Sequence, residues 1–232
     1  MMQAMGKIYV TVCICLMTIM DMMAQPDSPD NGLTLRQRYI AEIASCTGKG
    51  DLENLKPALA AGLDNGLTVN KVREVLIHAY AYCGFPRSMG ALNTFIGVLQ
   101  ERKARGINDA EGALPTLQEV SRSVEYGAAN QRKLFGRDAQ GAVLAFAPAI
   151  DQYLKAHLFG DIFGRDNLDW KTRELATIAM LAAMEGVENE LKVHIAHGKY
   201  NGLTDTQVDE IVTLVRASEW KPEPPKTFIA DD

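Results

Sequence analysis

The chain has 232 residues, of which 47% are hydrophobic and 23% charged, and 24 Lys and Arg against 29 Asp and Glu give a formal charge of −5. This balance is typical of a globular protein with a sizeable core. The lack of a basic surplus excludes a general nucleic-acid-binding protein, because such proteins neutralise phosphates with Lys and Arg. An enzyme or a binding protein remains.

Residues 1–24 have the features of an export signal. Lys7 is the only charged residue before an apolar run over residues 8–20, and Ala24 is a small residue at the expected cleavage point. The run is shorter than the about 20 residues that span a bilayer. We predict a cleaved signal peptide, a periplasmic or secreted location and no membrane association after cleavage. The alternative is a buried or frayed start of a cytoplasmic chain.

Cleavage would leave two cysteines, Cys46 and Cys83, which are far apart and in no CxxC arrangement. They can bridge in an oxidising compartment or stay as small buried hydrophobic residues, and the second is expected.

The chain contains an internal repeat. Residues 33–44 (LTLRQRYIAEIA) align with residues 168–179 (LDWKTRELATIA), and the NGLT of residues 65–68 recurs 136 positions later. We predict a duplication, with a first unit over residues 25–110, a second over residues 111–220 and a polar, Pro-rich tail over residues 221–232.

Each unit is expected to be helical. Thr34 and Thr204 begin capping boxes with a Gln three residues later, and Gly66 and Gly202 suit the left-handed residue between two helices. Residues 106–115 are rich in Gly, Asn, Asp and Pro, which predicts a loop between the units. A helical stretch over residues 117–163 should follow. Since no alternating strand pattern is present, the predicted fold class is all-α.

Residues 174–184 are apolar on nearly every face and should form a buried helix. This helix, within residues 171–183, resembles the buried helix of the carboxymuconolactone decarboxylase family, an all-helical group that includes the AhpD-like alkylhydroperoxidases. Residues 190–204 resemble the family's histidine-bearing helix and turn, and residues 73–87 its closing helix with a Tyr-x-Gly-x-Pro turn. The resemblance implies an AhpD-like helical fold of two tandem units. It also implies a homo-oligomer, a trimer of two-unit chains, because family members form closed rings of single units.

The peroxidase branch of this family uses a CxxC pair seven and four positions before its histidine. Here these positions are Val187 and Glu190 in the second unit, and Asp51 and Asn54 in the first. Without a thiolate at these places, attack on a peroxide oxygen has no nucleophile. Peroxidase (peroxiredoxin) activity is therefore disfavoured.

The resemblance places Glu174 and His194 of the second unit in one catalytic site. Decarboxylation of a carboxylactone leaves charge delocalised on the lactone carbonyl and needs a proton on carbon, which a histidine oriented by a carboxylate can supply. We predict His194 as the general acid and Glu174 as its orienting partner, without a cofactor. The alternative is structural: Glu174 pairs with Arg173 or Lys171 of a neighbour and holds the helices together.

The first unit lacks this pair, since Tyr39 aligns with Glu174 and Ala58 with His194. It keeps the turn over residues 82–86, so it is expected to supply the wall of the second unit's pocket. For each wall residue the alternative is ordinary core packing or, at position 197, a solvated side chain. The predicted substrate-binding residues are His78, Tyr82, Phe85 and His197.

Glu190, His194 and His197 share one face of a predicted helix, which raises the question of a metal site. A single helix rarely gives three ligands to one ion and no fourth ligand is evident, so no metal is predicted. The predicted function is a carboxymuconolactone decarboxylase-like carboxy-lyase acting on a small cyclic carboxylic acid or lactone. The alternative is a non-catalytic helical oligomer that binds a small ligand or a partner.

Overall fold

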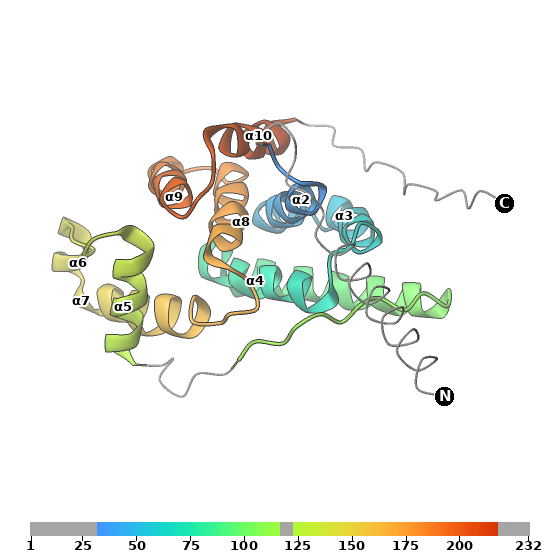
Figure 1. The fold of residues 1–232 in the computed structure, drawn as a ribbon, viewed down its shortest axis with the longest axis horizontal. Helices are drawn as coiled ribbons and strands as arrows, with labels where there is room; N and C mark the ends of the chain where they lie inside the picture. Colours follow the sequence, from blue (N-terminus) through green and yellow to red (C-terminus); the bar gives the residue numbers. More distant parts are fainter. Residues whose placement is uncertain (1–31, 117–122, 218–232) are drawn as a thin grey trace, which may run out of the picture.

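The computed structural model describes residues 32–116 and 123–217, and all regular elements in these ranges are helices, as predicted (Figure 1). The predicted signal peptide and the predicted tail lie outside the described residues. No helix in the described ranges is long and apolar enough to cross a membrane. The helices are α2 (Leu35–Lys49), α3 (Leu52–Asp64), α4 (Val69–Ala104), α5 (Val124–Phe135), α6 (Ala142–Phe146), α7 (Pro148–Tyr153), the π-helix η1 (Leu154–Ile162), α8 (Trp170–Ala182), α9 (Glu188–Tyr200) and α10 (Asp205–Arg216).

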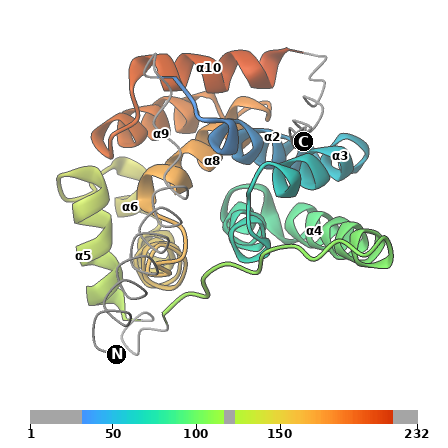
Figure 2. The same ribbon diagram turned by 45° about the vertical axis from the view of Figure 1, so that its right-hand side comes forward.

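The duplication is visible in three dimensions. Helices α2, α3 and α4 begin 135, 136 and 136 residues before α8, α9 and α10 respectively. Figures 1 and 2 show α2 and α8 side by side at the centre, with α10 above them and α4 below. One hydrophobic core contains residues of both units, among them Ile43 and Leu76 from the first and Ile178 and Ile211 from the second. The two units therefore fold around a shared core.

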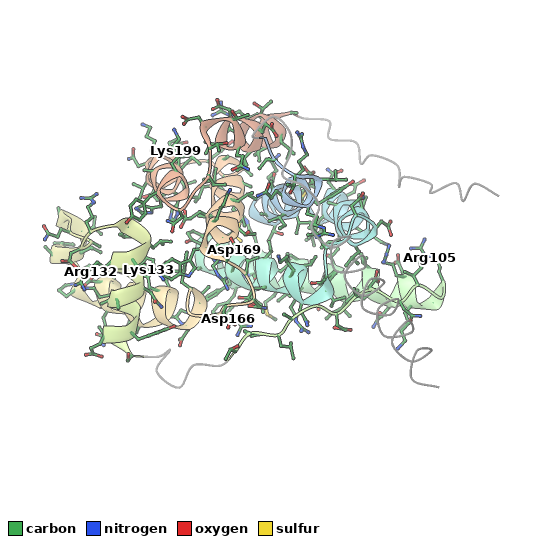
Figure 3. The ribbon with its side chains drawn as sticks, viewed as in Figure 1. Arg105, Arg132, Lys133, Asp166, Asp169 and Lys199 are labelled. Carbon is green, nitrogen blue, oxygen red and sulfur yellow. The ribbon has the colours of Figure 1, made fainter. Side chains whose placement is uncertain are left out.

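The predicted helix starts and turns are present. Thr34 and Thr204 cap α2 and α10 as complete capping boxes. Gly66 and Gly202 have φ angles of 87° and 98°, a region that glycine enters without steric cost. Asp169, labelled in Figure 3 at the start of α8, accepts a hydrogen bond from the N–H of Thr172 at 2.9 Å. Local sequence thus accounts for where these helices begin.

Helix α4 continues beyond the predicted turn but is kinked there. Gly84 has φ 78° and ψ 165°, and Pro86, which has no N–H to donate, follows two residues later. Ser88 donates a hydrogen bond to the carbonyl of Leu76 at 2.7 Å and ties the two halves of the helix together. The kink gives residues before and after Gly84 different surroundings.

The helices that precede α8, namely α5, α6, α7 and η1, form a separate layer at one end of the molecule (Figures 1 and 2). Helix α5 packs on η1 around a small core of Leu134, Phe159 and Phe163. Trp170, at the start of α8, donates its indole N–H to the carbonyl of Phe163 at 2.9 Å. Residues 107–116 are an extended loop without regular structure, as predicted for residues 106–115.

Candidate functional site

The centre of the site is a carboxylate–imidazole pair. Oε2 of Glu174, on α8, lies 2.8 Å from Nδ1 of His194, on α9. The side chain of Glu174 is fully buried, whereas that of His194 keeps 16% of its surface exposed. A buried carboxylate without a partner is costly, so this contact accounts for a buried Glu on α8. The imidazole is the member of the pair that a small molecule can reach.

The contact also fixes the roles of the two imidazole nitrogens. A carboxylate can only accept a hydrogen bond, so Nδ1 of His194 carries a hydrogen and donates it to Glu174. Nε2 is then left to exchange a proton with a ligand. The structural alternative for Glu174 was a pairing with Arg173 or Lys171. Arg173 instead donates to Glu74, at 2.8 Å, and to two backbone carbonyls.

Helix α4 of the first unit reaches this pair. The ring of Tyr82 contacts that of His194 edge-on at a centroid distance of 5.2 Å, and His78 lies 5.1 Å from Tyr82. Nε2 of His78 lies 2.9 Å from the hydroxyl of Thr177, which itself donates to the carbonyl of Arg173. The hydroxyl has one hydrogen, so Nε2 of His78 must be the donor and its Nδ1 is unprotonated.

His197 completes the cluster from α9. Its ring stacks on Phe135 of α5 at 3.9 Å and 15°, and lies 5.5 Å from the ring of His194. Phe85, in contrast, lies after the kink, is 63% exposed and stacks on Tyr80 at 4.1 Å. The structure therefore places His78, Tyr82 and His197 in the cluster around the Glu174–His194 pair. Phe85 instead packs on Tyr80 of the same helix.

Burial keeps these neighbouring groups uncharged. Burial is the largest cause of the pKa shift of each group. It lowers the pKa of His78 well below its ordinary value and that of His197 to about 4, and it raises the pKa of Tyr82. Four buried polar atoms of the cluster have no hydrogen-bond partner among residues 32–116 and 123–217. They are Nδ1 of His78, the hydroxyl oxygen of Tyr82, Oε1 of Glu174 and Nδ1 of His197. Most buried polar atoms in folded proteins are hydrogen-bonded, so four such atoms in one cluster favour a binding site.

The cluster also contains a possible set of metal ligands. One donor atom each from Glu174, His194 and His197 lie within 4.8 Å of one another. Glu190, considered from the sequence, is exposed, and the carboxylate in the group comes from the neighbouring helix instead.

Sequence reasoning missed Thr177 and Phe135, which orient His78 and His197. Thr177 follows Glu174 by three positions, so helical spacing places both on one face of α8. Phe135 belongs to a helix outside the repeat, and no spacing pointed to it.

The equivalent place in the first unit is filled by core side chains. Tyr39 and Ala58, which align with Glu174 and His194, are 1% and 0% exposed. The amide of Asn65 donates to the hydroxyl of Tyr39 at 3.2 Å. The repeat therefore has an acid–base pair only in its second unit.

The two cysteines of the described ranges are free thiols. Cys46 is buried, and burial, followed by the negative charge of Glu42, raises the pKa of its thiol to about 12. Burial also raises the pKa of the Cys83 thiol. Both thiols are therefore protonated near neutral pH, which makes them poor nucleophiles.

These features define a class of protein: an all-helical chain of two tandem three-helix units with a Glu–His pair in the second. The sequence model of the carboxymuconolactone decarboxylase family matches two segments, residues 16–95 and 148–223, which together make up more than half of the chain. The protein belongs to the carboxymuconolactone decarboxylase family. A comparison with curated proteins gives no match.

Proposed function

We propose that the protein is a carboxymuconolactone decarboxylase-like carboxy-lyase that acts on a small cyclic carboxylic acid or lactone. The observation that carries this proposal is the 2.8 Å contact between Nδ1 of His194 and the buried carboxylate of Glu174. His194 is the general acid, and Glu174 is a positioning residue that acts through it. The partial exposure of His194 supports contact with a substrate.

The chemistry follows from this arrangement. When the C–C bond to the carboxylate breaks, CO₂ leaves and the electron pair passes into the conjugated lactone carbonyl. Nε2 of His194 then delivers a proton to carbon, and His194 recovers a proton from solvent. Glu174 holds the imidazole in one tautomer and stabilises its protonated form electrostatically. Tyr82 and His78 stand beside the acid as neutral polar groups of the wall.

The test follows the disappearance of carboxymuconolactone by ultraviolet absorbance, with the full-length chain and its His194→Ala variant. We expect kcat/KM to fall at least about a hundredfold in the variant, because general acid catalysis contributes a factor of this size. His157→Ala is the matched control, since His157 is an exposed histidine paired with Asp161 at 2.8 Å and lies outside the cluster. Equal turnover by all three proteins would contradict the assignment of His194.

The same experiment separates the enzyme from a non-catalytic binder. If neither carboxymuconolactone nor a panel of related cyclic acids is turned over, the decarboxylase proposal fails. Ligand binding that raises the melting temperature and depends on His194 would then favour the binding protein.

We also propose that the protein is a homo-oligomer, a trimer of two-unit chains. Exposed apolar side chains support it, because large ones are unfavourable in water unless another surface covers them. Light scattering should give three times the mass of one chain, and a monomer would contradict the proposal. The exposed apolar side chains that support the oligomer are those of Phe85, Met89, Val143, Phe146 and Tyr153.

A further inference from the structure

The cluster around His194 contains buried nitrogen and oxygen atoms that have no hydrogen-bond partner among the described residues. Nδ1 of His78 is an acceptor, since Nε2 donates to Thr177, and Oε1 of Glu174 is a second acceptor. Nδ1 of His197 is buried as well and has no partner in the described part of the chain. Each buried polar atom without a partner costs about 1–3 kcal/mol. An electron-pair acceptor at this place would relieve that cost.

Three of these side chains have the composition of a metal site. Glu174, His194 and His197 provide one carboxylate and two imidazoles, with donor atoms within 4.8 Å of one another. Two histidines and a glutamate, with a fourth position left for water or substrate, are the ligands of one class of catalytic zinc site. Ligands on a tetrahedral zinc ion lie about 3.3 Å apart, so the spacing of the three donors is near the one that a single ion requires.

The surrounding helices hold the ligands on a rigid frame. His194 and His197 are three residues apart on one face of α9, and Glu174 faces them from α8. Phe135 stacks on the ring of His197, which limits its rotation. Ligands whose orientation is already fixed lose less conformational freedom when an ion binds.

We infer that Glu174, His194 and His197 bind one divalent transition-metal ion, for which Zn²⁺ is the probe. Two imidazole donors favour such an ion over Mg²⁺ and Ca²⁺, which prefer oxygen ligands. The binding rests on the geometry of the three side chains. A consequence rests on the proposed function: an ion on His194 and Glu174 occupies the general acid and its partner, so Zn²⁺ inhibits decarboxylation.

The test measures binding without substrate. The full-length chain, without a histidine tag and freed of metal by a chelator, is titrated with zinc sulfate in a calorimeter. We expect saturable binding of one ion per chain and no heat with magnesium chloride. Glu174→Gln, which keeps the side-chain volume, and His197→Gln should each weaken binding at least about tenfold. The Co²⁺ complex should absorb in the visible range, and this band should change in both variants.

The chain offers a matched control in His157, whose Nδ1 lies 2.8 Å from Asp161. This is the same type of pair, but it belongs to no group of three donors among the described residues. His157→Gln should bind Zn²⁺ as the unaltered chain does. Equal Zn²⁺ affinity in the unaltered chain, Glu174→Gln and His197→Gln would overturn the inference, and so would loss of binding in His157→Gln. Circular dichroism checks that each variant is folded.

The outcome is distinguishable from that of the proposed function. A chain that binds Zn²⁺ through these residues but turns over no lactone contradicts the decarboxylase proposal alone. A chain that decarboxylates and binds no Zn²⁺ contradicts the metal site alone.

Discussion

Arg173 of the second unit donates a hydrogen bond to Glu74 of the first at 2.8 Å, and the repeat supplies the reciprocal pair, Arg38 with Glu210 at 2.9 Å. Each arginine lies on the first helix of its unit, and each glutamate lies on the closing helix of the other. The side chains of Arg173 and Glu74 are 0% and 1% exposed, whereas those of Arg38 and Glu210 are 47% and 28% exposed. The duplicated sequence thus folds by exchanging equivalent contacts between its halves.

The buried pair also positions the candidate site. Glu74, His78 and Tyr82 are four residues apart along one face of α4. Arg173 and Glu174 are neighbours on α8. The ion pair therefore fixes the register in which α4 presents His78 and Tyr82 to the Glu174–His194 pair.

Glu74→Gln should destabilise the protein much more than Glu210→Gln. The first substitution leaves the buried guanidinium of Arg173 without its counter-charge, which costs about 3–5 kcal/mol of unfolding free energy. The second removes an exposed ion pair worth about 1 kcal/mol or less. Urea denaturation of both variants measures the difference. Similar losses in the two would show that burial does not distinguish the pairs.

Gly48→Ala should destabilise the junction of α2 and α8. A Cβ at Gly48 would lie 2.9 Å from the carbonyl oxygen of Met180 and 3.1 Å from its Cα, and backbone atoms cannot rotate away. Overpacking of this kind costs about 1–3 kcal/mol, more than the about 0.5–1 kcal/mol that Ala gains over Gly in a helix. Gly97→Ala is the control, because no atom of the described residues lies within 4 Å of an added Cβ, and it should stabilise the protein. Urea midpoints that rise in both variants would contradict the close approach.

How far the sequence predicts this structure depends on the range of each interaction. The capping residues Thr34 and Thr204 act within one helical turn, so their pattern identifies the helix starts. The Glu174–His194 contact was predicted from the family resemblance. The alignment of the two units also showed that the first unit lacks the pair, because Tyr39 and Ala58 occupy the equivalent positions. The pairing of Arg173 with Glu74 was missed, because it joins the two units and spacing along the chain does not encode it.

Two further differences have specific physical causes. Phe85 was expected beside His194, but the positive φ of Gly84 redirects the chain between Tyr82 and Phe85. For the proposed metal ligands, helical periodicity could relate only residues of one helix, and it placed Glu190 on the same face as His194 and His197. The packing of α8 on α9 supplied Glu174 instead.

The protein should lose stability as the pH falls below about 6.5, partly because of His78. Burial, then the charges of Arg173 and His194, lower the pKa of His78 in the folded state, so the unfolded chain binds a proton more readily. Stability from this group is full above the unfolded value of about 6.5 and decreases toward acid, by at most about 1.4 kcal/mol per pH unit.

His78→Leu tests this dependence. Its unfolding free energy at pH 7 serves as the reference, because the loss of the hydrogen bond to Thr177 and the removal of the unpartnered Nδ1 have opposite effects on stability. Between pH 6.5 and 4.5 it should decrease less steeply than that of the unaltered chain. Urea denaturation across this range measures both slopes, and parallel curves would show that His78 takes up its proton equally in both states.

Glu174→Gln should lower kcat on a turned-over lactone by about a hundredfold or more, with little change in KM. The amide oxygen of Gln can still accept the hydrogen bond from Nδ1 of His194, but it carries no charge to stabilise the imidazolium. Glu190→Gln is the control, since Glu190 precedes His194 by one turn of α9 and is exposed. A merely structural role for Glu174 would shift the urea midpoint and leave kcat of the folded protein unchanged. A lower kcat at constant KM and constant stability therefore assigns Glu174 to the orientation and charge balance of His194.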